Sequence, residues 1–175
     1  KPVQEQLLGW TTTIIEGNQI AVGDSCSPVL NYMNSKDDRK VVVGEKSMNI
    51  SDHIKFKRKV SQVITSSPYV PLQDGYYTLS AKIRNSNGFT KLEMYAVSND
   101  KVYSYSIKEE QAAWTTIELK SVLVKDGKVE IGFVAEGNAN AYCHIDDVAL
   151  VKRGQHVYEL SIPEVAKKIY NGHLK

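Results

Sequence analysis

The sequence lacks the features that mark membrane-spanning and nucleic-acid-binding proteins. No run approaches the roughly 20 apolar residues that a transmembrane helix needs, and the formal net charge of the 175-residue chain is only +2. No basic stretch is long enough to follow a nucleic-acid backbone. We interpret the densest one, residues 55–59, as the solvated start of a β-strand. The sequence therefore predicts neither a nucleic-acid partner nor a membrane span.

Motifs of familiar catalytic sites are also missing. There is no Gly-x-Ser-x-Gly elbow, His-Glu-x-x-His helix, P-loop or Cys-x-x-Cys pair. Gly23-Asp24-Ser25 resembles the nucleophile block of GDS-type esterases, which pair the serine with a histidine that has aspartate three positions earlier. The histidines, none of which has that aspartate, are His53, His144, His156 and His173. We expect no enzymatic activity, and an esterase built on Ser25 is the least supported alternative.

Cysteine is scarce, and the two that occur leave the cellular compartment open. A disulfide between Cys26 and Cys143 would close a long loop and contribute a few kcal/mol. Two buried thiols agree equally well with the count. The chain begins at Lys1-Pro2-Val3 without a signal peptide, as a mature or trimmed start would.

What the sequence does contain is alternation of apolar and polar residues with a period of two, which is typical of strands with one wet face. The segments with strand character are 10–15, 19–22, 41–50, 60–65, 77–84, 91–96, 116–122, 129–135 and 141–151. Turn residues such as Asp74-Gly75, Ser98-Asn99-Asp100 and Asp126-Gly127 separate them. Residues 25–40 are expected to form a long loop, and residues 163–170 a short helix or part of a linker. The pattern predicts an all-β, antiparallel β-sandwich over residues 1–155, with a C-terminal tail or linker over 156–175.

The order of short motifs along residues 5–152 points to a family. They are Gly9-Trp10-Thr11, residues 44–50, 60–64 and 75–84, Trp114-Thr115-Thr116-Ile117, and residues 129–137 and 144–150. This succession resembles the jelly-roll carbohydrate-binding modules related to the xylan- and galactan-binding families, which accompany secreted bacterial glycoside hydrolases. The resemblance implies a sugar site on the concave face or at a loop edge, and a secreted, periplasmic or cell-surface location.

The resemblance also implies a structural calcium ion. In such modules the first aspartate of an Asp-Asp-Val signature is a ligand, which corresponds here to Asp146, while Glu5 and the region of Glu45 stand where other ligands would lie. Carboxylates and carbonyls are the ligands that Ca²⁺ prefers. The usual Asn-x-Gly-Phe-Glu opening is replaced here by residues 1–5. The alternative is that Asp146 and Asp147 are an acidic pair bound to backbone or to a lysine.

Strand parity selects candidate sugar-binding residues. Sugars stack on aromatic rings and hydrogen-bond to planar polar side chains, so such residues at outward positions are the ones to consider. The candidates are Tyr95, Arg84, Glu93, Lys82 and Glu136 on one wet face, and Tyr32 on the long loop. Parity does not assign a strand to a sheet, and outward charges are often only solvated. Trp10 and Trp114 are predicted to close the core.

The predicted function is a non-catalytic module that binds polysaccharide and holds an attached or neighbouring glycoside hydrolase or lyase close to its substrate. The alternative is a sandwich that binds nothing and spaces or supports a neighbouring catalytic domain. Galactan, xylan, arabinan and rhamnogalacturonan all remain open as ligands.

Overall fold

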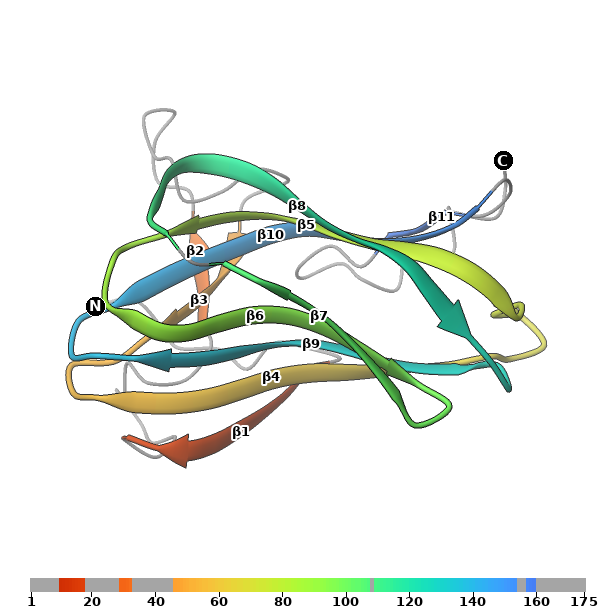
Figure 1. Cartoon of the computed structure of the whole chain (residues 1–175), viewed down its shortest axis with the longest axis horizontal. Coiled ribbons are helices and arrows are strands. Elements are labelled where there is room, and N and C mark those ends of the chain that lie inside the picture. Colours follow the sequence, from red (N-terminus) through yellow and green to blue (C-terminus); the bar gives the residue numbers. More distant parts are fainter. Residues whose placement is uncertain (1–9, 18–28, 33–45, 108, 154–156, 160–175) are drawn as a thin grey trace.

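The computed structural model is an antiparallel β-sandwich of two facing sheets (Figure 1). It describes residues 10–17, 29–32, 46–107, 109–153 and 157–159. In spatial order, the five-stranded sheet consists of β1 (Thr11–Glu16), β4 (Phe56–Thr65), β9 (Lys128–Gly137), β6 (Phe89–Ser98) and β7 (Lys101–Ser106). The six-stranded sheet consists of β2 (Val29–Tyr32), β3 (Lys46–Ser51), β10 (Tyr142–Lys152), β5 (Gly75–Asn85) and β8 (Gln111–Val124), with β11 (Val157–Glu159) paired to β10. The chain crosses repeatedly between the sheets, as in a jelly roll.

The predicted β-sandwich is confirmed, with two local differences. The segment expected to be a loop, 25–40, contains β2, whose four residues pair with β3 through the backbone. The sheet also continues past the predicted boundary at residue 155, because β11 pairs with β10. The strand predicted over 19–22 and the helix predicted over 163–170 lie outside the described residues. Among the described residues, no helix is long and apolar enough to cross a membrane.

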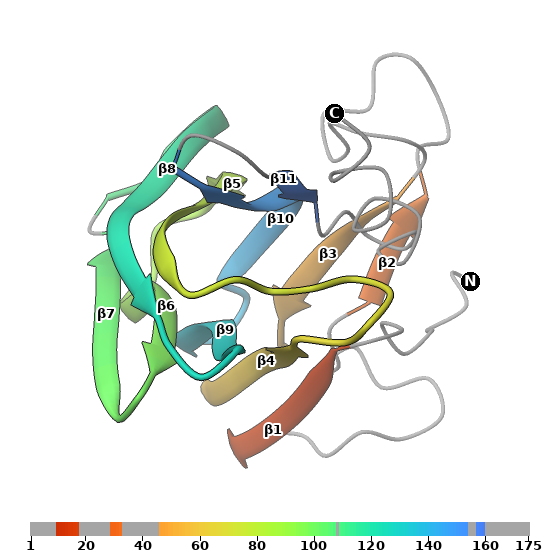
Figure 2. The same ribbon diagram turned by 90° about the vertical axis from the view of Figure 1, so that its right-hand side faces the viewer.

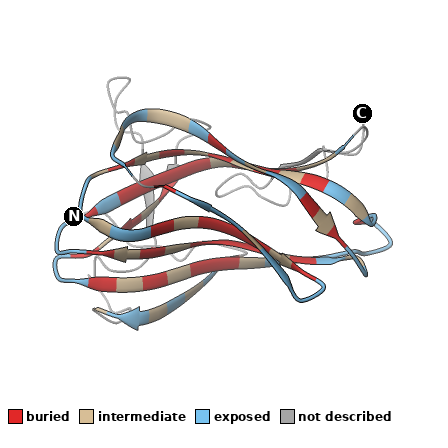
Figure 3. Cartoon of the chain, in the orientation of Figure 1, coloured by how far each residue is buried: buried red, intermediate tan, exposed pale blue. Residues whose placement is uncertain are grey.

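The core lies between the sheets and is built from the inward positions of the alternating strands (Figure 3). Along β5, for example, Leu79, Ala81 and Ile83 are buried, while Ser80 and Lys82 between them are partly exposed. Trp10 is buried against Phe133, which confirms its predicted role, whereas Trp114 is only half-buried. Cys143 is a free thiol in the core, and its burial raises its pKa. Its predicted partner Cys26 lies outside the described residues.

Two tight hairpin turns form where the sequence predicted breaks. Asn99 and Asp100 join β6 to β7 with φ angles of 50° and 62°. Asp126 and Gly127 join β8 to β9 with φ angles of 57° and 60°. Two consecutive left-handed residues match the twist of antiparallel strands, and Asn, Asp and Gly adopt this conformation at the lowest energy. The edge strands β7 and β8 lie on the same side of the sandwich (Figure 2).

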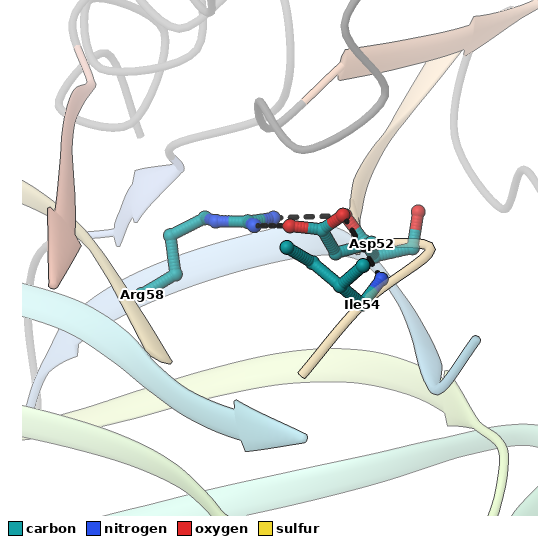
Figure 4. Close-up of polar contacts among 4 residues, drawn as sticks. Asp52, Ile54 and Arg58 are labelled. Atoms are coloured by element: carbon teal, nitrogen blue, oxygen red, sulfur yellow. Dashed lines mark hydrogen bonds and ion pairs between the residues drawn. The ribbon is translucent and has the colours of Figure 1, made fainter. Parts of the chain in front are cut away.

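An ion pair is buried where β3 connects to β4 (Figure 4). The Arg58 and Asp52 side chains are 0% exposed, and Nη2 of Arg58 lies 2.8 Å from Oδ2 of Asp52. Nη1 of Arg58 donates to the carbonyl of Ser51, and its guanidinium lies 4.8 Å from the centroid of the Phe56 ring. The basic stretch 55–59 does begin a strand, but the prediction that it is solvated is wrong for Arg58. The Asp52 carboxylate makes an inward arginine possible at this position.

Candidate functional site

The outer face of the five-stranded sheet carries polar side chains arranged around an aromatic ring. Directly opposed residues of antiparallel strands share a face, so the registers of β4, β9, β6 and β7 define its members. We call this surface the outer polar face. It comprises Lys57, Lys59, Ser61, Lys91, Glu93, Tyr95, Ser104, Ser106, Glu130, Gly132 and Glu136, together with Val63, Val97, Val102 and Val134.

Tyr95 forms the centre of the outer polar face. It lies opposite Gly132, and its ring occupies the space above that glycine, where a methyl group added to the glycine Cα would lie 2.7 Å from the tyrosine Cε1 atom. The Tyr95 hydroxyl donates a hydrogen bond to Glu130 at 2.5 Å and accepts one from Ser61. A side chain from β6 therefore reaches across β9 to β4, and the absence of a side chain at Gly132 is what permits it.

This placement corrects part of the prediction for Tyr95. The side chain points to the outer face, as strand parity predicts, but it is only 7% exposed. Because the ring lies down over Gly132 and its hydroxyl is engaged on both sides, Tyr95 forms the floor of the face. It is not the exposed stacking platform that the sequence predicted.

Charged side chains flank this floor in pairs. Nζ of Lys59 lies 3.7 Å from the Glu130 carboxylate, and Nζ of Lys57 lies 4.0 Å from that of Glu136. Such partly exposed pairs contribute little to stability, but they restrain the carboxylates that would accept hydrogen bonds from a ligand. Glu93 is half-buried beside Tyr95 and forms no hydrogen bond or ion pair within the described part of the chain.

The predicted single wet face does not exist. Glu93, Tyr95 and Glu136 lie together on the outer polar face, but Lys82 and Arg84 lie on β5, in the other sheet. Since the outward positions of β5 face away from the five-stranded sheet, these two residues are on the opposite side of the molecule. Lys82 donates to the hydroxyl of Thr116, and Arg84 donates to the carbonyl of Ala112.

The outer face of the six-stranded sheet holds a second polar group, of which sequence reasoning missed His144 and Tyr142. His144 on β10 lies opposite Arg84, and Asp146 lies opposite Lys82. Both His144 and Asp146 are buried, and the ring of His144 lies 5.2 Å from that of Tyr142. Alternation along β10 places Tyr142 and His144 on the same outward face as Asp146, and this pattern in the sequence could have revealed them.

The remaining predicted site residues fall mostly outside the described part of the chain. Glu5, Glu45 and Ser25 lie beyond it, and of Tyr32 only its backbone in β2 is described. Asp146 is fully buried next to a β-bulge, and its Oδ1 accepts a hydrogen bond from the amide of Asp147. Among the described residues, no three His, Cys, Asp or Glu side chains gather where they would hold a metal ion.

The Tyr95 environment predicts a dependence of stability on pH. Burial is the main cause that raises the pKa of Tyr95, followed by the hydrogen bond to Glu130 and the charge of Glu130, while the Ser61 hydrogen bond acts the other way. A pKa raised on folding gives stability that is complete below the unfolded-state value and is lost as the pH rises above it. We expect the free energy of unfolding to fall more steeply above pH about 10 in the wild type than in Tyr95→Phe. Urea denaturation at several alkaline pH values measures both slopes, and equal slopes would contradict the prediction.

Comparison with known proteins identifies the fold. No protein-family model matches the sequence, and no curated protein is significantly similar to it. Among solved structures, the carbohydrate-binding module TmCBM61, determined in complex with β-1,4-galactotriose, superimposes with a TM-score of 0.67 and 17% identity. That match covers 85% of this chain and 91% of the module.

Two further structures extend the likeness. A family 11 carbohydrate-binding module from Clostridium thermocellum, in complex with a β-1,3-1,4-mixed-linked tetrasaccharide, has a TM-score of 0.50 at 14% identity over 85% of this chain and 91% of its own. The K1 cleaved adhesin domain of Lys-gingipain from Porphyromonas gingivalis W83 has a TM-score of 0.54 at 12% identity over 84% and 92%. The chain therefore has the β-sandwich fold found in carbohydrate-binding modules.

Proposed function

We propose that this chain is a non-catalytic glycan-binding module and that its outer polar face is the binding surface. The observation that carries the proposal is the Tyr95 ring over Gly132, bordered by fixed carboxylates and lysines. A flat apolar floor with polar groups around it is the chemistry that a sugar ring and its hydroxyls require. The fold likeness to modules solved with bound oligosaccharides supports the same conclusion.

Glu93 is the side chain on which this proposal is most sensitively tested. Its carboxylate is next to the floor and accepts no hydrogen bond from the described part of the chain, so it is available to sugar hydroxyls. Hydrogen bonds to a charged acceptor contribute about 1.5–3 kcal/mol. We expect Glu93→Gln to weaken binding about tenfold or more, since about 1.4 kcal/mol corresponds to a factor of ten.

Affinity gel electrophoresis against soluble galactan, xylan, arabinan and mixed-linked glucan measures this effect. Glu118→Gln is the matched control, because Glu118 is exposed on the opposite sheet and the change in charge is the same. Retardation of the wild type and the control by one polymer, with weaker retardation of Glu93→Gln, is the expected result. Equal losses in the two variants would place the binding surface elsewhere.

The alternative of a sandwich that only spaces or supports a neighbouring domain is favoured by one observation. Tyr95 is buried and Lys59 is paired with Glu130, so several polar groups of the outer polar face already have partners within the chain. A spacer has no affinity to lose. Absence of retardation of the folded wild-type chain by every polymer would favour this alternative.

We further propose that the module is secreted, serves an attached or neighbouring polysaccharide-degrading enzyme, and binds a structural calcium ion through Asp146. Support for calcium comes from the buried carboxylate of Asp146 and from Ser47, whose hydroxyl is buried without a hydrogen-bond partner. Ser47 precedes the residue that pairs with Ile145, and so lies beside Asp146. The contributions of Glu5 and Glu45 rest on the family resemblance alone.

Calcium removal tests the metal. A ligand at a hundred times its Kd stabilises the folded state by about 2.7 kcal/mol, which corresponds to roughly 5–10 °C for a chain of this size. We expect EDTA to lower the melting temperature of the wild type by this amount and to leave Asp146→Asn unchanged. Asp147→Asn, a neighbouring half-buried carboxylate, should keep the EDTA response. A wild-type melting temperature that EDTA does not alter would contradict the proposal.

A further inference from the structure

Three chain connections at one end of the sandwich form a single hydrogen-bonded surface, at the right-hand end in Figure 1. We call it the turn platform; it comprises residues 66–74, 98–101 and 125–128, flanked by Lys152 and Arg153. The Ser98 hydroxyl accepts from the amide of Lys125 at 3.0 Å and donates to the carbonyl of Lys128 at 2.8 Å. The amide of Ser66 donates to the carbonyl of Gly127 at 2.7 Å. Segments from both sheets are thereby held in one fixed arrangement.

Tyr69 projects from this platform into solvent. Its side chain is 86% exposed, more than any other large apolar or aromatic residue of the described chain. The loop beneath it is restrained, because Pro68 and Pro71 fix their φ angles. Two hydrogen bonds also join Ser67 and Val70. The amide of Ser67 donates to the carbonyl of Val70 at 3.1 Å, and the amide of Val70 donates to the hydroxyl of Ser67 at 3.0 Å. A rigidly presented tyrosine offers a large contact area with little loss of conformational entropy on binding.

The platform and its two flanking residues together carry a formal charge of +2. The three segments contain three lysines and three aspartates, and the excess comes from the flanking cations; the residues are Lys101, Lys125 and Lys128, Asp74, Asp100 and Asp126, and the flanking Lys152 and Arg153. This excess of two positive charges equals the formal net charge of the whole chain, so the remainder of the molecule is balanced. One aspartate, Asp74, is already engaged, because its carboxylate accepts from the amide of Gly127 at 3.1 Å.

A second aromatic ring stands beside the flanking cations. Tyr76 is 47% exposed, and the Arg153 guanidinium lies 5.5 Å from its ring centroid. The amide of Arg153 donates to the carbonyl of Tyr76 at 3.0 Å, which fixes the two residues side by side. Exposed rings next to exposed cations suit a ligand that has both apolar sugar faces and negative charges.

We propose that the turn platform is a second binding surface, distinct from the outer polar face, and that it binds an anionic polysaccharide. The ring of Tyr69 would contact a sugar face, while Lys125 and Lys128 attract its carboxylate or sulfate groups. The attraction acts over about a Debye length and is therefore sensitive to salt. The proposal does not depend on binding of a neutral glycan by the outer polar face.

Retention of the full chain on immobilised polygalacturonate, at about 20 mM and about 300 mM NaCl, tests the platform. We expect Lys125→Gln with Lys128→Gln, and separately Tyr69→Ala, to lower the affinity at low salt about threefold to tenfold. The control is Lys55→Gln, compared with Lys125→Gln alone, because it removes the same single charge from an exposed position in the β3–β4 connection, away from the platform. It should stay within about twofold of the wild type. All variants should keep the wild-type melting temperature, because the substituted side chains are exposed.

Three outcomes would overturn the proposal. The wild type passes through the column unretained, or the control loses as much affinity as the platform variants. Alternatively, immobilised single-stranded DNA retains the wild type equally well and responds to the same substitutions, in which case the platform binds polyanions without selecting a glycan. Failure on polygalacturonate leaves retardation by neutral polysaccharides and the Glu93→Gln comparison unaffected, so the two proposals fail separately.

Discussion

Replacement of Arg58 by methionine is expected to lower the free energy of unfolding by about 3–5 kcal/mol, since it leaves the Asp52 carboxylate in the interior without its cationic partner. Both side chains are fully buried, and the guanidinium also bonds to the carbonyl of Ser51 and covers the Phe56 ring. Loss of Arg58 thus removes an ion pair, a backbone hydrogen bond and packing together. Urea denaturation followed by tryptophan fluorescence measures the change.

Two comparisons separate this effect from a general loss of charge. Lys59→Met removes the next cation of the same strand, whose pair with Glu130 is partly exposed, and should change the free energy by less than about 1 kcal/mol. Asp52→Asn combined with Arg58→Met removes both charges and should recover part of the loss. A loss below about 1 kcal/mol for Arg58→Met alone would show that the buried pair does not stabilise the β3–β4 connection.

Gly132→Ala is expected to destabilise the chain by about 2–3 kcal/mol, as overpacking in a filled site does. A methyl group at this position would lie 2.7 Å from Cε1 of Tyr95, and closer still to the carbonyl oxygen of Val60. The ring can move, but the carbonyl belongs to the ladder between β4 and β9. The substitution therefore disturbs both the sheet and the floor of the outer polar face.

Two readouts check this prediction. Thermal unfolding gives the loss of stability, and retardation of the remaining folded protein by the polymer that binds the wild type should weaken because Tyr95 is displaced. Tyr95→Ala introduced together with Gly132→Ala should relieve only the contact with the ring, so that part of the loss persists. A Gly132→Ala protein as stable as the wild type would contradict the described packing of Tyr95 over β9.

The alternation of side chains made the sandwich predictable, because it depends only on which positions of each strand are apolar. The hairpin turns at Asn99-Asp100 and Asp126-Gly127 were predictable as well, because they depend only on residues that favour positive φ angles. Trp10 was correctly expected in the core. The strand β2 escaped prediction because its four residues are too few to show a period of two.

The composition of the candidate site was much less predictable. Alternation with a period of two shows which side chains of a strand share a face, but not the sheet to which the strand belongs. Lys82 and Arg84 were therefore grouped with residues of the other sheet. The burial of Tyr95 depends on a glycine in a different strand, and the burial of Arg58 depends on Asp52 in a preceding turn. These are consequences of pairing between distant segments, which a single sequence does not reveal.

The most direct test of glycan binding by the outer polar face is a nuclear magnetic resonance titration of the ¹⁵N-labelled chain with β-1,4-galactotriose, followed by the other oligosaccharides of the panel. We predict that the amides of Glu93, Tyr95 and Gly132 shift progressively with one of these sugars, while those of β5 and β10 do not. If no sugar shifts these amides at saturating concentration, or if the shifts lie on the six-stranded sheet, the outer polar face is not the glycan-binding surface.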